Sequence, residues 1–208
     1  MTTQDPDAPQ IYLVTPPEFD LGTFPDRLAR VLDGVETACL RLSLATRDED
    51  RLMRAADAVR EIAHRVDVAL VIDTHVMLAD RLGLDGVHLV DGARSVRTAR
   101  KTLGPDAIVG AWCTQSRHDG MTAGEHGADY VAFGPVSGVL GDGEVAEHEL
   151  FAWWTEMIEV PVVAEGGLTP ELVRSLAPVT DFFAVGEEIW REEDPLAALQ
   201  SLRDAMRG

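Results

Sequence analysis

Lysine is almost absent from this chain of 208 residues: Lys101 is the single lysine among 18 basic residues, and the rest are arginines. A reaction that needs a lysine amine therefore has one candidate. Positive charge of any kind is scarce, because 36 aspartates and glutamates give the chain a formal net charge of −18. A surface with this charge repels nucleic acids and anionic membranes, so we expect neither as a partner.

Long apolar runs are also missing, since every apolar stretch stops far short of the roughly 20 residues that cross a membrane. The first ten residues, MTTQDPDAPQ, are polar and acidic and lack the basic start and apolar run of a signal peptide. We therefore expect a flexible segment over residues 1–9, one domain over residues 10–208 and a cytoplasmic protein. Cysteine is limited to Cys39 and Cys113, which excludes a spaced metal cluster and favours two small buried side chains.

What the sequence does contain is a regular alternation of short apolar runs with amphipathic helical stretches, which is typical of repeated βα units. Eight strand-like runs can be counted, at residues 11–16, 38–44, 69–74, 86–90, 107–113, 130–136, 160–167 and 181–188. Eight units in about 200 residues predict an α/β fold, a single (β/α)8 (TIM) barrel. A doubly wound open sheet is the alternative, but it usually carries a glycine fingerprint after its first strand, where this chain reads TPPEFDLG.

Helix signals between the runs support this count. Thr169-Pro170 and Asp194-Pro195 each offer a capping side chain followed by proline at the first helical position. Another segment places apolar residues at helical spacing and charges on the other face, the apolar positions being Leu52, Ala55, Ala56, Val59 and Ala63.

A (β/α)8 barrel builds its active site at the carboxyl ends of its strands, so the residues that close each run are the candidates. Arg41 stands between Leu40 and Leu42 and alternates to the opposite face, which points into the barrel. There it either clamps a phosphate or carboxylate of a ligand or pairs with an inward carboxylate such as Asp73.

A second candidate is the pair Gly166 and Gly167, which precedes a helix start at Thr169. Backbone amides at such a place can face a phosphate, although a tight turn into the helix is an equally simple interpretation. The loop after the eighth run normally completes a barrel phosphate site, and here it begins at Gly186. The carboxylates of Glu187-Glu188 follow, and they favour a bound phosphate only if they point away from it.

Three residues are candidates for general acid or base: Asp73, His75 and His88. His75 lies just past Asp73, which could orient its ring, or it is simply a histidine at a helix start. His88 stands in mid-strand, where a histidine is either a catalytic group or a hydrogen-bonded core residue. Asp73 and Asp91 close neighbouring strands, so together they could supply oxygen ligands to a divalent metal such as Mg²⁺.

Two further residues close strands at the predicted mouth. Trp112 either stacks on a heteroaromatic ligand or fills the mouth and closes it. Gly134 ends the sixth run and precedes a glycine-rich loop over residues 137–143. We count both among the ligand-binding candidates.

Three segments give the chain a resemblance to a known family: IDTHVMLADRLGLDGVHL at residues 72–89, GADYVAFGPV at 127–136 and VVAEGGLTPE at 162–171. In their order and spacing they resemble the thiamine phosphate synthase family, which includes a thiazole tautomerase branch. The resemblance implies a (β/α)8 barrel, often a homodimer, that joins a hydroxymethylpyrimidine pyrophosphate to a thiazole phosphate with Mg²⁺.

The chain departs from the family's pattern where charge is needed. Of the family's Gln-x-Arg-x-Lys only Arg41 is present, Thr74 stands where a metal ligand belongs, and Asp91 is shifted from the place of the second metal carboxylate. The loop at 137–143 has neither the family's threonines nor its lysine. Such groups stabilise a pyrophosphate leaving group, so these differences predict a diverged active site.

We therefore expect a thiamine phosphate synthase-like protein that binds a small phosphate-bearing or heteroaromatic ligand. Two alternatives stay open. One is a catalytically inactive ligand-binding or regulatory protein, in which Trp112 and acidic residues occupy the mouth. The other is a sugar-phosphate isomerase or epimerase, in which Asp73 faces Glu165 or His88 as an acid–base pair.

Overall fold

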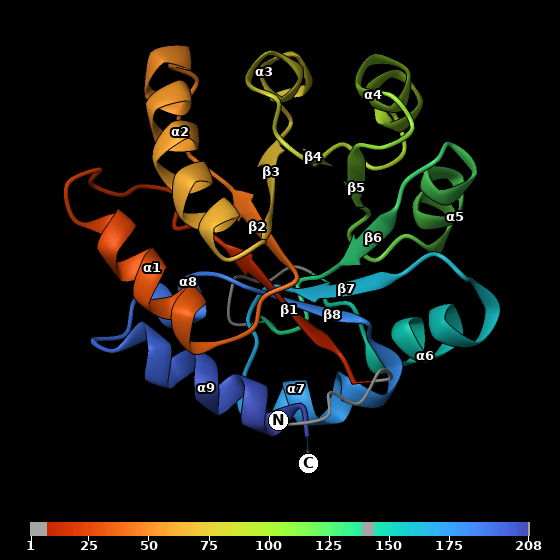
Figure 1. The fold of residues 1–208 in the computed structure, drawn as a ribbon. Helices are drawn as coiled ribbons and strands as arrows, with labels where there is room; N and C mark the ends of the chain where they lie inside the picture. Colours follow the sequence, from red (N-terminus) through yellow and green to blue (C-terminus); the bar gives the residue numbers. More distant parts are fainter. Residues whose placement is uncertain (1–7, 139–143, 208) are drawn as a thin grey trace.

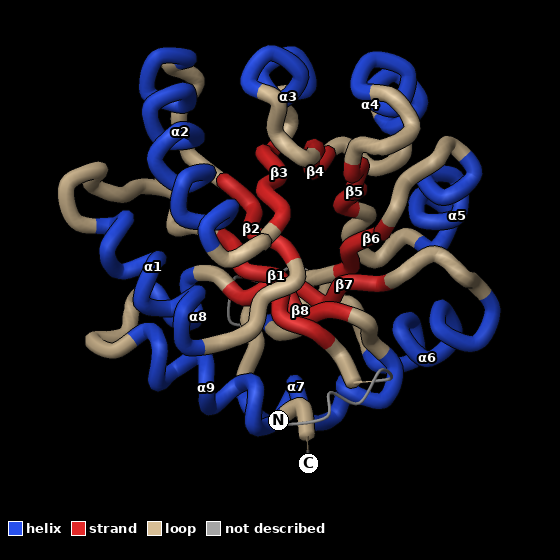
Figure 2. The backbone as a smooth tube through the Cα atoms, in the orientation of Figure 1, coloured by secondary structure: helices blue, strands red, loops and turns tan. Residues whose placement is uncertain are grey.

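The eight expected strands form a closed parallel barrel in the computed structural model, which describes residues 8–138 and 144–207. The strands pair in chain order, and β8 pairs with β1 (Figure 1 and Figure 2). Their bounds are β1 Gln10–Val14, β2 Cys39–Leu42, β3 Ala69–Asp73, β4 Gly86–Leu89, β5 Ile108–Trp112, β6 Tyr130–Phe133, β7 Val162–Glu165 and β8 Phe182–Val185. The predicted (β/α)8 barrel is thus confirmed, and the doubly wound sheet is wrong.

Helices surround the barrel on its outside (Figure 2). They are α1 Phe24–Gly34, α2 Glu49–Arg65, α3 Val76–Leu82, α4 Val96–Leu103, α5 Arg117–Glu125, α6 His148–Met157, α7 Pro170–Leu176, the 3₁₀ turn Ala177–Val179, α8 Glu187–Trp190 and α9 Pro195–Ala205. None of these helices is long and apolar enough to cross a membrane, and this holds for the described residues. Residues 1–7 of the expected N-terminal segment and 139–143 of the expected loop lie outside the described residues.

Two of the helices begin where the capping signals predicted. The Thr169 hydroxyl accepts a hydrogen bond from the Leu172 amide at 3.3 Å, and the Asp194 carboxylate accepts one from the Ala197 amide at 3.3 Å. The apolar stripe of α2 is buried against the barrel, as its spacing indicated. Burying one large apolar side chain contributes about 1.5–3 kcal/mol, so this interface between helices and strands is the main source of stability.

Three aspartates fix the amino-terminal end of the barrel by repeating one contact. Asp85, Asp129 and Asp181 each precede an even-numbered strand, and each carboxylate accepts a hydrogen bond from a backbone amide of the strand before it. The distances are 2.7, 2.7 and 2.8 Å. A carboxylate that accepts an amide hydrogen bond makes a charge-assisted contact, so the repeat holds the register of neighbouring strands.

The barrel interior contains a chain of polar side chains below the mouth. The hydroxyls of Tyr12 and Tyr130 lie 2.6 Å apart, and Nδ1 of His88 lies 2.9 Å from the Tyr130 hydroxyl. All three side chains are buried. The two hydroxyls and Nδ1 of His88 thus have partners within the core, as buried polar atoms generally do.

Gly110 makes room for this layer. A Cβ atom at Gly110 would overlap the ring of Tyr130, whose hydroxyl is held by two partners and has no space to move. The residue type at this position is therefore set by packing rather than by backbone conformation.

We predict that Gly110→Ala lowers the free energy of unfolding by about 1–3 kcal/mol or more, because the added methyl overpacks the barrel interior. Gly22→Ala is the matched control, since its nearest neighbour is the exposed Asp20 carboxylate, and we expect a change within about 0.5 kcal/mol. Urea unfolding followed by circular dichroism measures both. Equal stability of the Gly110→Ala variant and the parent would contradict the packing of Tyr130.

Candidate functional site

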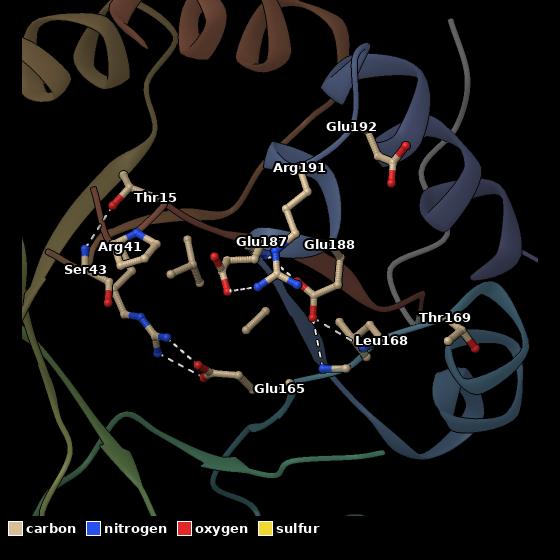
Figure 3. Close-up of a pocket in the computed structure, with 16 residues that line it drawn as sticks. Thr15, Arg41, Ser43, Glu165, Leu168, Thr169, Glu187, Glu188, Arg191 and Glu192 are labelled. Carbon is tan, nitrogen blue, oxygen red and sulfur yellow. Dashed lines mark hydrogen bonds and ion pairs between the residues drawn. The ribbon is translucent and has the colours of Figure 1, made fainter. Parts of the chain in front are cut away.

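A cavity of about 480 Å³ opens at the carboxyl ends of β1, β2, β7 and β8, where a barrel of this kind places its active site (Figure 3). Its lining combines apolar surface with backbone amides and with two arginines and four glutamates. These charged residues are Arg41, Arg191, Glu165, Glu187, Glu188 and Glu192.

Arg41 lies at the floor of this cavity and points inward, as its alternation predicted. Its guanidinium donates hydrogen bonds to both carboxylate oxygens of Glu165, one of them at 3.0 Å, and its Nε lies 3.4 Å from Oδ1 of Asp73. The Arg41 side chain is 6% exposed, so these contacts are screened little by water. Of the two predicted roles, the structure shows the ion pair, although with Glu165 as the main partner.

Arg41, Glu165 and Asp73 affect one another's charge states. Burial lowers the pKa of Arg41, but the carboxylates of Glu165 and Asp73 outweigh that effect, so the net pKa lies well above the ordinary value and the guanidinium stays charged. Burial also raises the pKa of the Asp73 carboxyl, and the nearby guanidinium offsets only part of this. Asp73 and Glu165 share one arginine, which does not match the opposed and independent acid–base pair of an isomerase.

The other two predicted acid–base residues, His75 and His88, lie outside the cavity at the mouth. His75 is half-buried and immediately precedes α3, so it is a histidine at a helix start. His88 is 1% exposed and belongs to the interior chain with Tyr130. Burial, together with the charge of Arg41, lowers the pKa of His88 well below its ordinary value, so the ring is neutral. Neither histidine lines the cavity at the mouth.

The two glycines after β7 have a backbone conformation that favours glycine. Gly166 and Gly167 have φ angles of 87° and 77°, a left-handed conformation that residues with side chains rarely adopt. A Cβ atom at Gly167 would in addition overlap the hydroxyl of Ser137. This turn directs the amides of Gly167 and Leu168 into the cavity.

Those amides already hold an anion, and it comes from the chain itself. Oε1 of Glu188 accepts hydrogen bonds from the amides of Gly167 at 3.0 Å and Leu168 at 3.3 Å. Oε2 of the same carboxylate accepts one from the amide of Gly186 at 2.9 Å. We call these three amides the amide cradle. Of the three glycines expected to bind an anion, Gly167 and Gly186 donate their amides to Glu188, and the amide of Gly166 does not take part. Glu188 points into these amides rather than away.

Two of the predicted ligand-binding residues, Gly134 and Trp112, lie outside the cavity over Arg41. Gly134 lies where a Cβ atom would overlap the carbonyl of Glu165 and crowd the Trp112 ring, so its small size is a packing requirement. Trp112 lines a different cavity of about 540 Å³, together with Asp91 and His118. Trp112 and Gly134 are thus absent from the lining of the cavity over Arg41.

The residues predicted to hold Mg²⁺ do not fit a shared metal site. Asp73 faces the guanidinium of Arg41, whereas Asp91 lies in the other cavity and accepts a hydrogen bond from the Ser95 hydroxyl at 2.7 Å. Across residues 8–138 and 144–207, no three His, Cys, Asp or Glu side chains are grouped so that they could hold a metal ion.

Sequence reasoning missed two contacts. The sequence places Glu165 inward, opposite Asp73, but does not identify it as the main partner of Arg41. The sequence gives no signal for the position of Glu188, because this position depends on one side-chain rotamer after the turn at Gly186.

The prediction that both cysteines are small buried residues is confirmed. Cys39 and Cys113 are buried, and burial raises the pKa of each thiol to about 12.

Fold and site together define a (β/α)8 barrel with a mouth cavity and an anion-binding set of amides. The family model for thiamine monophosphate synthase matches residues 11–189 of the chain. The chain is also 41% identical to the thiamine-phosphate synthase of Rhodospirillum centenum, over 96% of this chain and 98% of that protein. It is 39% identical to the thiamine-phosphate synthase of Erythrobacter litoralis, over 94% of each. The chain belongs to the thiamine monophosphate synthase family.

Solved structures agree on the fold. The thiamine phosphate pyrophosphorylase from Pyrococcus furiosus superposes with a TM-score of 0.82 at 23% identity, over 95% of each chain. The 3-hexulose-6-phosphate synthase from Salmonella typhimurium gives a TM-score of 0.72 at 15% identity, over 95% of this chain and 98% of that one. At such low sequence identities, these structural similarities show only that the barrel fold is shared.

We predict that Arg41→Met lowers the free energy of unfolding by about 3 kcal/mol, because it removes a buried cation and leaves two partly buried carboxylates without a counter-ion. The matched control is Arg65→Met, which removes the exposed pair with Asp33 and costs about 1 kcal/mol or less. Urea unfolding at pH 7.5 measures both variants. A loss below about 1 kcal/mol for Arg41→Met would contradict the buried ion pair.

The neutral, buried state of His88 predicts a pH dependence of stability. Below about pH 6.5 the unfolded chain binds a proton at His88 that the folded chain does not, so unfolding becomes easier as pH falls. The contribution reaches about 1.4 kcal/mol per pH unit. Urea unfolding at pH 7.5, 6.5 and 5.5 should show this slope in the parent and a slope smaller by that amount in His88→Gln. Identical slopes would contradict the assignment.

Proposed function

We propose that this chain binds the substrates of thiamine phosphate synthase at its barrel mouth and joins them there, a pyrimidine pyrophosphate with a thiazole phosphate. The observation that carries the proposal is the full-length similarity to proteins with that name, together with a mouth cavity bordered by an amide cradle. In this reaction the thiazole nitrogen attacks the methylene carbon of the pyrimidine, and the bond from that carbon to the pyrophosphate oxygen breaks.

The side chains of the cavity suggest how the ligand is held. Backbone amides after β7 and β8 provide neutral donors for a phosphate group, and the apolar side chains of Val14 and Leu168 lie beside them for a ring. Arg41 contributes through position rather than through free charge, because Glu165 and Asp73 already hold it. It keeps the carboxylate of Glu165 fixed at the floor of the cavity.

The paired charges of the cavity imply a slow displacement of pyrophosphate. Arg41 is paired with Glu165, and Arg191 is paired with Glu187 at 2.6 Å, so both arginines in the lining already have a carboxylate partner. A pyrophosphate leaving group is stabilised mainly by positive charge, and one missing donor typically costs about 10²–10³ in rate. We therefore propose a diverged active site that works more slowly than its relatives.

Two further proposals, on cellular location and oligomeric state, rest on the family resemblance. We propose that the protein acts in the cytoplasm, where small phosphorylated precursors are made, and that it forms a homodimer. Light scattering coupled to gel filtration should give twice the chain mass of 22.6 kDa. A mass of one chain at micromolar concentration would contradict the dimer.

The function is tested by incubating the pure protein with Mg²⁺, the pyrimidine pyrophosphate and the thiazole phosphate, and by following thiamine phosphate and pyrophosphate. We expect both products in equal amounts, at a rate at least ~100-fold below that of the Rhodospirillum centenum relative assayed in parallel. A rate equal to that of the relative would contradict the diverged site. Calorimetry that shows no binding of either precursor would contradict the proposed function.

A further inference from the structure

The carboxylate of Glu188 is placed in the amide cradle as a bound anion would be. Its two oxygens accept hydrogen bonds from Gly167, Leu168 and Gly186 at 3.0, 3.3 and 2.9 Å, and Figure 3 shows the side chain reaching across the cavity toward the segment after β7. The donors come from two loops, one after β7 and one after β8. A phosphate that used these donors would need the space and the hydrogen bonds that Glu188 now takes.

The backbone that carries Glu188 is firmly held. The next two residues, Ile189 and Trp190, are buried, and the Trp190 indole donates a hydrogen bond to the Val14 carbonyl at 2.6 Å. The ring of Trp190 also packs edge-on against Phe24, with 5.0 Å between centroids. Helix α8 therefore delivers the carboxylate from a fixed position, and only the side chain of Glu188 has to rotate for the cradle to be emptied.

The charges around the cavity add to this competition. Arg41 binds Glu165 and Arg191 binds Glu187, whereas within the described residues Glu188 has no salt bridge. The hydrogen bonds from the amide cradle are therefore its stabilising contacts. A ligand phosphate that enters meets this carboxylate at close range, and like charges at close range repel strongly where water is scarce.

We propose that Glu188 is a specificity-determining residue that competes with the phosphate of a ligand for the amide cradle. The inference rests on the proposed function, since it concerns the same cavity. Glu188 thereby weakens binding of phosphorylated ligands, while ligands that carry a hydroxyl instead of the phosphate are not subject to the competition. Removal of the carboxylate frees three amide donors and removes one negative charge.

The variants are Glu188→Ala, which empties the cradle, and Glu188→Gln, which keeps the shape and removes the charge. Glu192→Gln is the matched control, because Glu192 lines the same cavity and lies away from the cradle (Figure 3). The probes are inorganic phosphate, hydroxyethylthiazole phosphate and hydroxyethylthiazole. Calorimetry gives the dissociation constants, and the melting temperature with and without phosphate gives an independent readout.

We expect Glu188→Ala to bind inorganic phosphate and the thiazole phosphate at least tenfold more tightly than the parent, with hydroxyethylthiazole unchanged. Glu188→Gln should fall between them, and Glu192→Gln should stay within threefold of the parent. Phosphate should raise the melting temperature of Glu188→Ala more than that of the parent, because a ligand that binds the folded state stabilises it. A residue that only braced the fold would not produce this difference.

Two results overturn the inference: phosphate affinity that is the same in the parent and both Glu188 variants, or a gain as large in Glu192→Gln. Failure of the proposed function gives another pattern. Suppose that neither thiazole compound binds any variant while inorganic phosphate binds Glu188→Ala tenfold more tightly than the parent. That result supports the competition by Glu188 and contradicts the proposed thiamine substrates. If Glu188→Ala does not fold, Glu188→Gln decides the question with the same probes.

Discussion

The guanidinium of Arg41 joins three strands at the mouth of the barrel, and the site around it depends on this contact. Arg41 extends from β2, Glu165 from β7 and Asp73 from β3, so one buried cation connects opposite sides of the barrel mouth. The cost of burying these charges is offset only while all of them are present. The same contact sets what the mouth can do, because a cation with two carboxylate partners is not free to hold a ligand.

Glu188 repeats this principle with backbone donors in place of an arginine. The amides of Gly167, Leu168 and Gly186 form the amide cradle, and the chain fills it with its own carboxylate. In this member of the thiamine monophosphate synthase family, glutamates of the chain itself thus occupy both arginines of the cavity lining and the amide cradle.

Much of the fold follows from local signals. Eight apolar runs, proline-marked helix starts and alternation around Arg41 suffice to predict the barrel and the inward arginine, because each depends on residues close together in the sequence. The glycines at 166 and 167 likewise indicate a turn before a helix, and both have positive φ angles. The pairing of Arg41 with Glu165 and the contacts of Glu188 could not be predicted in the same way. Arg41 and Glu165 lie 124 residues apart, and the direction of Glu188 is decided by a single rotamer in a cavity that four strands create.

The central claim is that the chain itself occupies the anion-binding donors of its barrel mouth. The most direct test follows the backbone amide resonances of Gly167, Leu168 and Gly186 by NMR while inorganic phosphate is added to the unmodified protein at pH 7.5. The account predicts that these resonances stay in place through the micromolar range of phosphate. Saturating shifts of all three amides at micromolar phosphate would show a free phosphate site and would contradict the account.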